Sequence, residues 1–141
     1  MKVVILAGGQ GTRLREVSKE TPKPMVEIGG KPILWHIMSH YASYGFKEFV
    51  ICLGYNGYVI KDFFLNYAVY NADISVDLQS GAVDIFNKNE VDWRVHLVDT
   101  GQDTMTGGRI KRVQDIIGGE RFFLTYGDAV SNVPRICRWL E

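Results

Sequence analysis

Lys2-Val-Val-Ile-Leu-Ala-Gly-Gly-Gln-Gly-Thr-Arg13 is the stretch of sequence that decides the fold of this chain. A short apolar run over residues 2–6 leads into a turn with glycines at positions 8, 9 and 11. Glycine adopts positive φ readily and lets backbone N–H groups approach an anion closely. Arg13 and Lys23, which stands between two prolines, add the full positive charges that backbone dipoles lack. The stretch therefore predicts a buried strand that ends at a phosphate-binding loop.

The loop differs from two well-known glycine loops. It lacks the Gly-Lys-Ser/Thr ending of a P-loop, and its glycines do not have the G-x-G-x-x-G spacing of a dinucleotide-binding turn. A tight structural turn is the alternative interpretation, because turns from strand to helix also use glycine. The length of the motif and its two cations favour phosphate binding.

The rest of the chain alternates short apolar runs with stretches of helical period. Strands are predicted over residues 2–6, 49–53, 93–98 and 122–126, and helices over 31–44, 58–67, 107–117 and 132–140. This alternation is typical of a parallel sheet covered by helices. We therefore predict an α/β fold with a Rossmann-like, mainly parallel sheet flanked by helices.

One segment departs from that pattern. Ile74, Val76 and Leu78 alternate with polar residues before Ser80-Gly81, and Val83 and Ile85 alternate after it. The pattern predicts an inserted β-hairpin at about residues 73–86. Because a hairpin with one apolar face is marginally stable alone, we expect it to pack against another subunit in a homo-oligomer.

Composition and charge limit the function classes. The chain has 141 residues, 46% of them hydrophobic, and 16 basic residues balance 16 acidic ones. Without surplus positive charge, we expect no nucleic-acid partner, and no run approaches the ~20 apolar residues of a membrane span. The cysteines at 52 and 137 lack metal-ligand spacing, so we expect reduced thiols in a cytoplasmic protein. His36 and His40, four residues apart, could bind metal, but their apolar neighbours favour ordinary packing.

Candidate site residues lie after the predicted strands, where α/β sheets bind ligands. Three segments converge there: the Gly8–Arg13 loop, the stretch 99–109, and Gly127-Asp128. Thr106-Gly-Gly-Arg109 opens a predicted helix and offers backbone groups and a second arginine to a base or phosphate. Asp128 supplies the hard oxygen that Mg²⁺ prefers, although a turn-forming aspartate is the alternative.

The string Leu6-Ala-Gly-Gly-Gln-Gly-Thr-Arg-Leu14, together with Pro22-Lys-Pro24, resembles the signature of the sugar-nucleotide pyrophosphorylases. The strings 23–38, 54–61, 98–101 and 105–113 are similar to one branch of that family, the glucose-1-phosphate cytidylyltransferases. The resemblance implies CTP and α-D-glucose 1-phosphate as substrates, and CDP-glucose and diphosphate as products. It also implies a role upstream of dideoxyhexoses or related surface sugars, such as those of lipopolysaccharide O antigen, and assigns the choice of CTP to Val98-Asp-Thr-Gly101 and Met105-Thr-Gly-Gly-Arg109.

The resemblance also implies roles for single residues. Arg13 and Lys23 would be catalytic, Arg13 at the β- and γ-phosphates and Lys23 between the α-phosphate and the sugar phosphate. Asp128 would hold Mg²⁺. The nucleotide-binding set implied is Leu6, Ala7, Gly8, Gly9, Gly11, Thr12, Arg13, Lys23, Thr106, Gly107, Gly108, Arg109 and Asp128.

The family continues well past residue 141, with further strands that bind the sugar. We therefore expect residues 1–141 to be the nucleotide-binding part of a nucleotidyltransferase domain that is incomplete at its C-terminus. Two alternatives stay open: a non-catalytic nucleotide-binding or assembly module, and a pyrophosphorylase of another base (dTTP or GTP) or another sugar.

Overall fold

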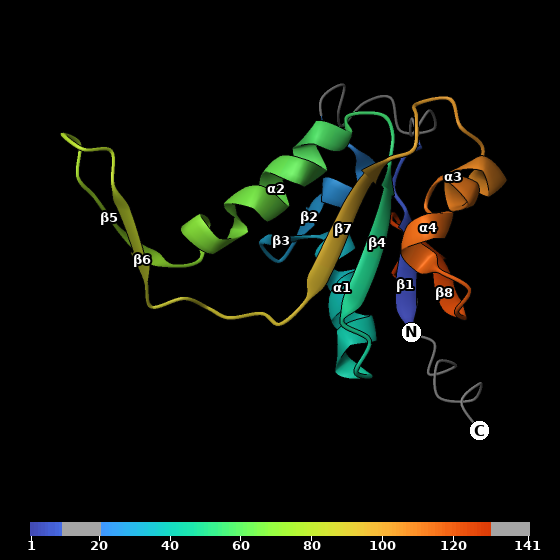
Figure 1. Cartoon of the computed structure of the whole chain (residues 1–141), viewed down its shortest axis with the longest axis horizontal. Helices are drawn as coiled ribbons and strands as arrows, with labels where there is room; N and C mark the ends of the chain where they lie inside the picture. Colours follow the sequence, from blue (N-terminus) through green and yellow to red (C-terminus); the bar gives the residue numbers. More distant parts are fainter. Residues whose placement is uncertain (10–20, 131–141) are drawn as a thin grey trace.

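Four parallel strands form the central sheet, in the spatial order β7-β4-β1-β8 (Figure 1). Their bounds are β1 (Lys2–Leu6), β4 (Glu48–Leu53), β7 (Arg94–Asp99) and β8 (Phe122–Tyr126). The computed structural model describes residues 1–9 and 21–130. The predicted helix over residues 132–140 and Cys137 lie outside the described residues. The predicted α/β fold with a parallel sheet is confirmed.

Helices cover both faces of this sheet. They are α1 (Ile33–Ser43), α2 (Gly57–Tyr70), α3 (Thr106–Arg112) and α4 (Gln114–Ile117). Apolar side chains alternate along β1: Val3 and Ile5 pack with α1 and α2, whereas Val4 and Leu6 pack with α3 and α4. Because β1 and β4 are covered on both sides, both read as continuous apolar runs in the sequence.

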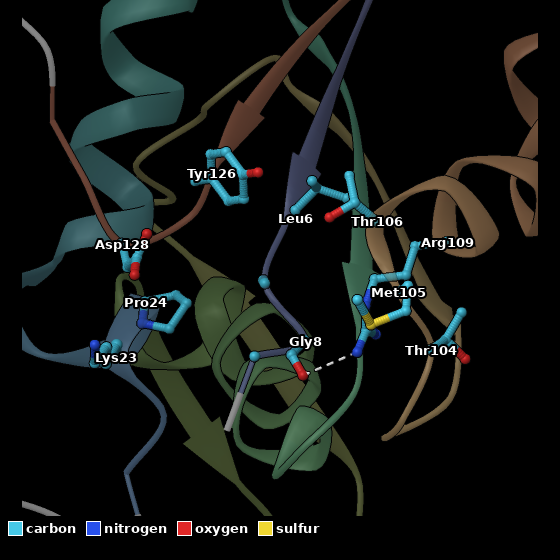
Figure 2. Close-up of a pocket in the computed structure, with 12 residues that line it drawn as sticks. Leu6, Gly8, Lys23, Pro24, Thr104, Met105, Thr106, Arg109, Tyr126 and Asp128 are labelled. Atoms are coloured by element: carbon cyan, nitrogen blue, oxygen red, sulfur yellow. Dashed lines mark hydrogen bonds between the residues drawn. The ribbon is translucent and has the colours of Figure 1, made fainter. Parts of the chain in front are cut away.

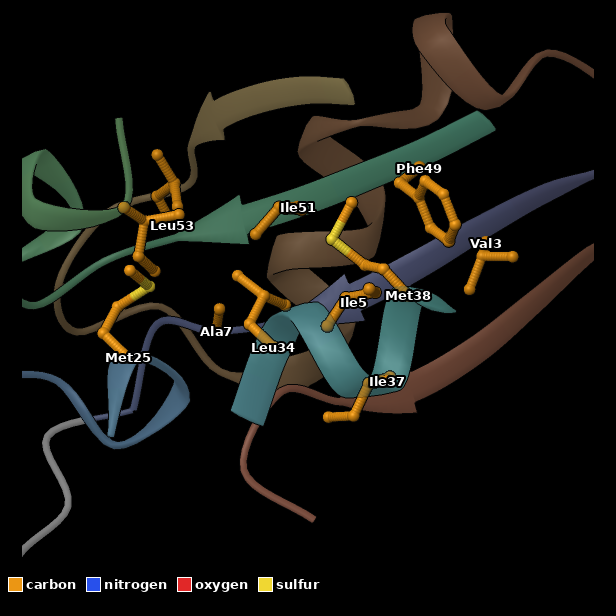
Figure 3. Close-up of a cluster of buried hydrophobic side chains, with 11 residues drawn as sticks. Val3, Ile5, Ala7, Met25, Leu34, Ile37, Met38, Phe49, Ile51 and Leu53 are labelled. Carbon is orange, nitrogen blue, oxygen red and sulfur yellow. The ribbon is translucent and has the colours of Figure 1, made fainter. Parts of the chain in front are cut away.

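The larger core lies between the sheet and α1. Figure 3 shows Leu34, Ile37 and Met38 of α1 reaching the sheet face that carries Ile5 and Ile51. Met25 joins the same cluster from the short 3₁₀ helix η1 (Lys23–Met25). The prolines around Lys23 therefore belong to a segment that is anchored in the core.

Two details differ from the sequence-based expectation. The helix expected from residue 31 begins at Ile33, because Gly29 and Gly30 turn a short ribbon of β2 (Glu27–Ile28) and β3 (Lys31–Pro32). Both glycines have positive φ, which suits a tight turn between antiparallel strands. The helix expected over residues 107–117 is divided at the buried Val113 into α3 and α4.

The predicted hairpin forms from β5 (Asp73–Val76) and β6 (Val83–Phe86). It makes a separate two-stranded sheet that projects from the end of α2, away from the main sheet (Figure 1). Leu78 lies in the turn instead of a strand and is 92% exposed. Within the described residues, no helix is both long and apolar enough to cross a membrane.

Candidate functional site

A pocket of about 440 Å³ opens at the carboxyl ends of β1 and β8. This is the point at which the chain, after building β4 and β7 on one side of β1, crosses to the other side. Open α/β sheets bind ligands at such a switch point because the loops diverge there and leave a crevice. The lining residues are Leu6, Ala7, Gly8, Gly9, Lys23, Pro24, Thr104, Met105, Thr106, Arg109, Tyr126 and Asp128.

Figure 2 shows the pocket as a floor between two unlike walls. The floor is the end of β1 from Leu6 to Gly8. One wall carries Lys23 and Asp128, with Tyr126 beside them, and the other carries Thr106 and Met105. The wall with Lys23 and Asp128 has the groups that attract phosphate and a divalent cation, whereas Thr106 and Met105 on the opposite wall are uncharged, with the Arg109 side chain next to them.

Backbone hydrogen bonds hold the floor in place. The Ala7 N–H donates to the Cys52 carbonyl at 3.0 Å, and the Gly127 N–H donates to the Leu6 carbonyl at 2.9 Å. Both bonds continue the sheet ladder by one residue on each side of β1. The loop that follows therefore starts from a fixed point.

Arg109 lies at the side of this floor that faces away from Lys23 (Figure 2), and it is 6% exposed. Its Nη1 donates to the Leu53 carbonyl at 3.0 Å and to Thr100 Oγ1 at 2.8 Å. Its Nη2 donates to the carbonyls of Gly8 and Gln102, both at 3.1 Å. The guanidinium thus joins the ends of β1, β4 and β7.

Two glycines make room for that guanidinium. A Cβ atom on Gly8 would overlap the Arg109 guanidinium, and one on Gly54 would lie 2.7 Å from Nη1. Such distances are too short for any real side chain to tolerate without displacement of the arginine. At Gly8, the glycine of the predicted phosphate loop is therefore required by its contact with Arg109.

The segment Val98–Gly101 does not line the pocket. Thr100 is fully buried, and its hydroxyl donates to the Leu53 carbonyl at 2.8 Å while accepting from Arg109. Asp99 accepts a bond from the Gly101 N–H at 2.9 Å. The segment therefore meets the pocket through its neighbours Arg109 and Thr104, which line it.

The predicted site residues divide into three groups. Those that the structure brings together around the pocket are Leu6, Ala7, Gly8, Gly9, Lys23, Thr106, Arg109 and Asp128. Gly107 and Gly108 lie in the first turn of α3 but not in the lining, and Gly108 faces the Thr104 methyl group. Gly11, Thr12 and Arg13 lie outside the described residues.

The predicted nucleotide-binding set omitted four lining residues, Pro24, Thr104, Met105 and Tyr126, although Met105 stands in a string assigned to the choice of CTP. Tyr126 is the last residue of β8 and is 59% exposed, and Met105 precedes α3 and is 82% exposed. Both were identifiable as large side chains placed directly after a strand or before a helix at the ligand-binding edge.

The fit of Mg²⁺ to the pocket rests on Asp128. Among the described residues, no three His, Cys, Asp or Glu side chains cluster as a metal site. Mg²⁺ is commonly held by one or two carboxylates together with substrate phosphates and waters, so a single aspartate at the rim of this pocket fits it.

The histidines and Cys52 have structural surroundings. His36 Nε2 lies 2.8 Å from the Ile28 carbonyl, and His40 packs against the rings of Tyr41 and Tyr44. Burial raises the pKa of the Cys52 thiol to about 11, although the charge of Arg109 acts in the opposite direction. The predicted packing role of the histidines agrees with these contacts.

Known proteins resemble this chain both in sequence and in structure. The model of the nucleotidyl transferase family matches residues 2–86. The chain is 52% identical to glucose-1-phosphate cytidylyltransferase of Salmonella typhimurium over 134 residues, which are 94% of this chain and 52% of that relative. It is 48% identical to a probable glucose-1-phosphate cytidylyltransferase of Bacillus subtilis over 133 residues, with the same coverages.

Among solved structures, HddC from Yersinia pseudotuberculosis superposes with a TM-score of 0.68 at 29% identity, covering 99% of this chain and 52% of that one. A UDP-glucose pyrophosphorylase superposes with a TM-score of 0.66 at 20% identity, covering 99% of this chain and 51% of that one, which supports the fold alone. The chain spans about half the length of the relatives it matches.

Proposed function

The chain belongs to the nucleotidyl transferase family, and from that premise we propose that it is the nucleotide-binding part of a glucose-1-phosphate cytidylyltransferase. The reaction would join CTP to α-D-glucose 1-phosphate and release diphosphate. The similarity to the Salmonella enzyme along nearly the whole chain carries this choice of reaction. The pocket at the switch point of the sheet supports its location.

The proposed chemistry needs no protein nucleophile. An oxygen of the sugar phosphate attacks the α-phosphorus of CTP in line, a new P–O bond forms, and the bond to the β-phosphate oxygen breaks. Two polyanions must be held together during this exchange, so positioning and positive charge supply the catalysis.

Lys23 is proposed to lie between the α-phosphate and the sugar phosphate, where its ammonium would reduce their mutual repulsion. Its place on the same wall as Asp128 supports this role. Asp128 would bind Mg²⁺, which when bound supplies charge neutralisation at phosphate oxygens. Arg13 is proposed to hold the β- and γ-phosphates through its planar fork.

The remaining lining residues are proposed to orient the nucleotide. Backbone groups at Gly8 and Gly9, with Gly11 and Thr12, would hold the triphosphate. Thr106, together with Gly107 and Gly108 and the backbone near Gly8, would contact the cytosine edge. The unlike character of the two walls supports this direction for the nucleotide, with phosphates toward Lys23 and base toward Thr106.

The test is diphosphate release with glucose 1-phosphate, Mg²⁺ and each of CTP, dTTP, GTP and ATP. It would be run on the 141-residue chain and on a chimera that continues after residue 130 with the C-terminal half of the Salmonella relative. We expect the chimera to release diphosphate with CTP in preference to the others. A preference for dTTP or GTP would overturn the cytidylyl assignment and leave the family intact.

The same assay separates the second candidate, a non-catalytic nucleotide-binding module. CTP binding by calorimetry without diphosphate release from either protein would support the module and contradict the catalytic proposal.

We also propose that copies of the chain associate through the hairpin and that the protein is cytoplasmic. The hairpin register places Ile74 opposite Ile85 and Val76 opposite Val83, so one face is apolar. Val76 and Val83 are 46% and 50% exposed within a single chain. A two-stranded ribbon needs a partner for stability, and a second copy would supply it.

A further inference from the structure

We propose that Arg109 is a positioning residue that fixes the peptide group between Gly8 and Gly9, so that the Gly9 N–H faces the Lys23 side of the pocket and is ready to bind a phosphate. This inference rests on the proposed function, because it assigns the phosphate-binding amide of the same site. Arg109 would act through the backbone and not by touching the nucleotide phosphates.

Hydrogen bonds hold the Arg109 guanidinium in one orientation. It makes four hydrogen bonds, to the carbonyls of Leu53, Gly8 and Gln102 and to Thr100 Oγ1, and only 6% of the residue is exposed. A guanidinium has five N–H donors in a fixed planar fork. Because all four acceptors are neutral oxygen atoms at or just after the ends of three strands, the sheet sets the orientation of the guanidinium.

The bond from Arg109 also orients the peptide group between Gly8 and Gly9. The Gly8 carbonyl accepts from Arg109 Nη2 at 3.1 Å and from the Tyr55 N–H at 3.4 Å. In a trans peptide, the C=O of one residue and the N–H of the next point in opposite directions. The described peptide bonds are all trans, so the Gly9 N–H points away from Arg109.

Lys23 lies on the side of Gly8 that faces away from Arg109. In Figure 2, Lys23 and Arg109 stand on opposite sides of Gly8, with the dashed bond from Arg109 meeting the Gly8 carbonyl. The Gly9 N–H is therefore directed toward the Lys23 side. A backbone N–H and an ammonium that face the same space form a natural pair of donors for one phosphate.

Charge provides a second effect of the same side chain. Among the ion pairs between residues 1–9 and 21–130, none includes Arg109, and its four hydrogen-bond acceptors are neutral oxygen atoms. A buried cation next to the pocket attracts an anion without contact. Replacement by lysine keeps this charge and removes the fork, and so separates the two effects.

The experiment compares Arg109→Lys with Arg112→Lys in the 141-residue chain. Arg112 is a matched control because it lies on the same helix and donates to the Thr100 carbonyl at 2.8 Å, not to Gly8. The chain is labelled with ¹⁵N-glycine, and Gly9→Ala assigns the Gly9 amide, since a Cβ at Gly9 would meet nothing within 4 Å. Inorganic triphosphate and CTP are the probes.

In the wild type and in Arg112→Lys, we expect an ordered Gly9 amide by ¹⁵N relaxation and a Gly9 amide shift when triphosphate is added. In Arg109→Lys, we expect a mobile Gly9 amide, no such shift, and CTP affinity lower by about tenfold or more. Arg109→Gln, which keeps donors but no charge, serves if Arg109→Lys does not fold.

A folded Arg109→Lys or Arg109→Gln protein whose Gly9 amide stays ordered would overturn the positioning role. So would a wild type whose Gly9 amide is already mobile. If the wild type instead bound neither triphosphate nor CTP while Gly9 order still depended on Arg109, the proposed function would fail and the structural part of this inference would stand.

Discussion

A Cβ atom on Gly54 would lie 2.6 Å from the carbonyl oxygen of Gly8. The loops that leave β1 and β4 therefore contact each other through the backbone at Gly8 and Gly54, and the Arg109 guanidinium packs beside this contact. The absence of side chains at both positions lets the arginine reach the carbonyls of Gly8 and Leu53 at once. A single methyl group added at Gly54 would therefore destabilise the folded chain.

Gly54→Ala is expected to lower the free energy of unfolding by about 1–3 kcal/mol, because the methyl group must push back the Gly8 backbone and Arg109. Chemical denaturation measures this. Gly119→Ala is the control, since a Cβ there would meet nothing within 4 Å, and its effect should stay within about 0.5 kcal/mol. Equal stability of the two variants would contradict the close approach.

Lys23→Ala in the chimera is expected to lower kcat by about a hundredfold or more, comparable to the loss of one preorganised oxyanion-hole donor. Lys23 is proposed to meet the group being transferred, where charge changes most between ground and transition state. Steady-state kinetics measures kcat and KM separately. A variant with intact kcat and raised KM would make Lys23 a docking charge only.

Arg13→Ala in the chimera is expected to lower kcat and also to raise the KM for CTP, because the β- and γ-phosphates are bound before the chemical step. Arg13→Lys should restore only part of the loss, since a point charge cannot replace a bidentate fork. Full rescue by lysine would indicate that charge alone is needed at this position.

Asp128→Asn is expected to remove most of the gain in CTP affinity that Mg²⁺ provides, because the amide is a weaker ligand for a hard cation. Calorimetry with Mg²⁺ and with EDTA measures the gain. Asp115→Asn, at an exposed position of α4, makes the same chemical change away from the pocket. An unchanged Mg²⁺ effect in Asp128→Asn would remove Asp128 from the metal site.

Val83→Lys is expected to convert the associated protein to monomer, because it places a charge on the apolar face of the hairpin. Ser75→Lys is the control, since Ser75 pairs with Asp84 on the opposite face. Light scattering at micromolar concentration measures the mass. A wild type that is already monomeric there would dispose of association through the hairpin.

Cys52 is expected to resist iodoacetamide at pH 8 in the folded chain and to react after denaturation. Burial raises its pKa from 9.0 to about 11, which lowers the reactive thiolate at that pH by about a hundredfold. Peptide mapping separates Cys52 from Cys137. Equal labelling in both states would mean that the strand is open to reagent.

The sequence predicted most of the sheet because its strands are short runs rich in apolar residues. The bounds of β1 and β8 match the expected ranges, β4 begins one residue earlier, and β7 is shifted by one residue at both ends. The hairpin was also predicted from alternation alone. Gly29-Gly30 was misread because a pair of glycines before a helix looks the same as a pair that turns a short ribbon.

The site was predicted in part. Motif positions placed Gly8, Lys23 and Asp128 at one edge of the sheet, and the structure brings them together. The orientation of Arg109 could not be predicted, because its acceptors at Gly8, Leu53 and Gln102 are up to 101 residues away in sequence. Whether a cation faces a pocket or the backbone depends on acceptors that only the folded sheet provides.

Strand β1 is paired with β4 on one side and with β8 on the other, in register from Lys2 opposite Phe122 to Leu6 opposite Tyr126. During synthesis, β4 is available once residue 53 has emerged, but β8 must wait for residue 126. At about 5–20 residues per second, that interval lasts roughly 4–15 s. During this time the unpaired side of β1 is an open sheet edge. An open edge can pair with the strand of another chain, so a nascent chain needs protection there. The arrival of β8 closes that edge and, in the same step, brings Tyr126 and Asp128 to the pocket.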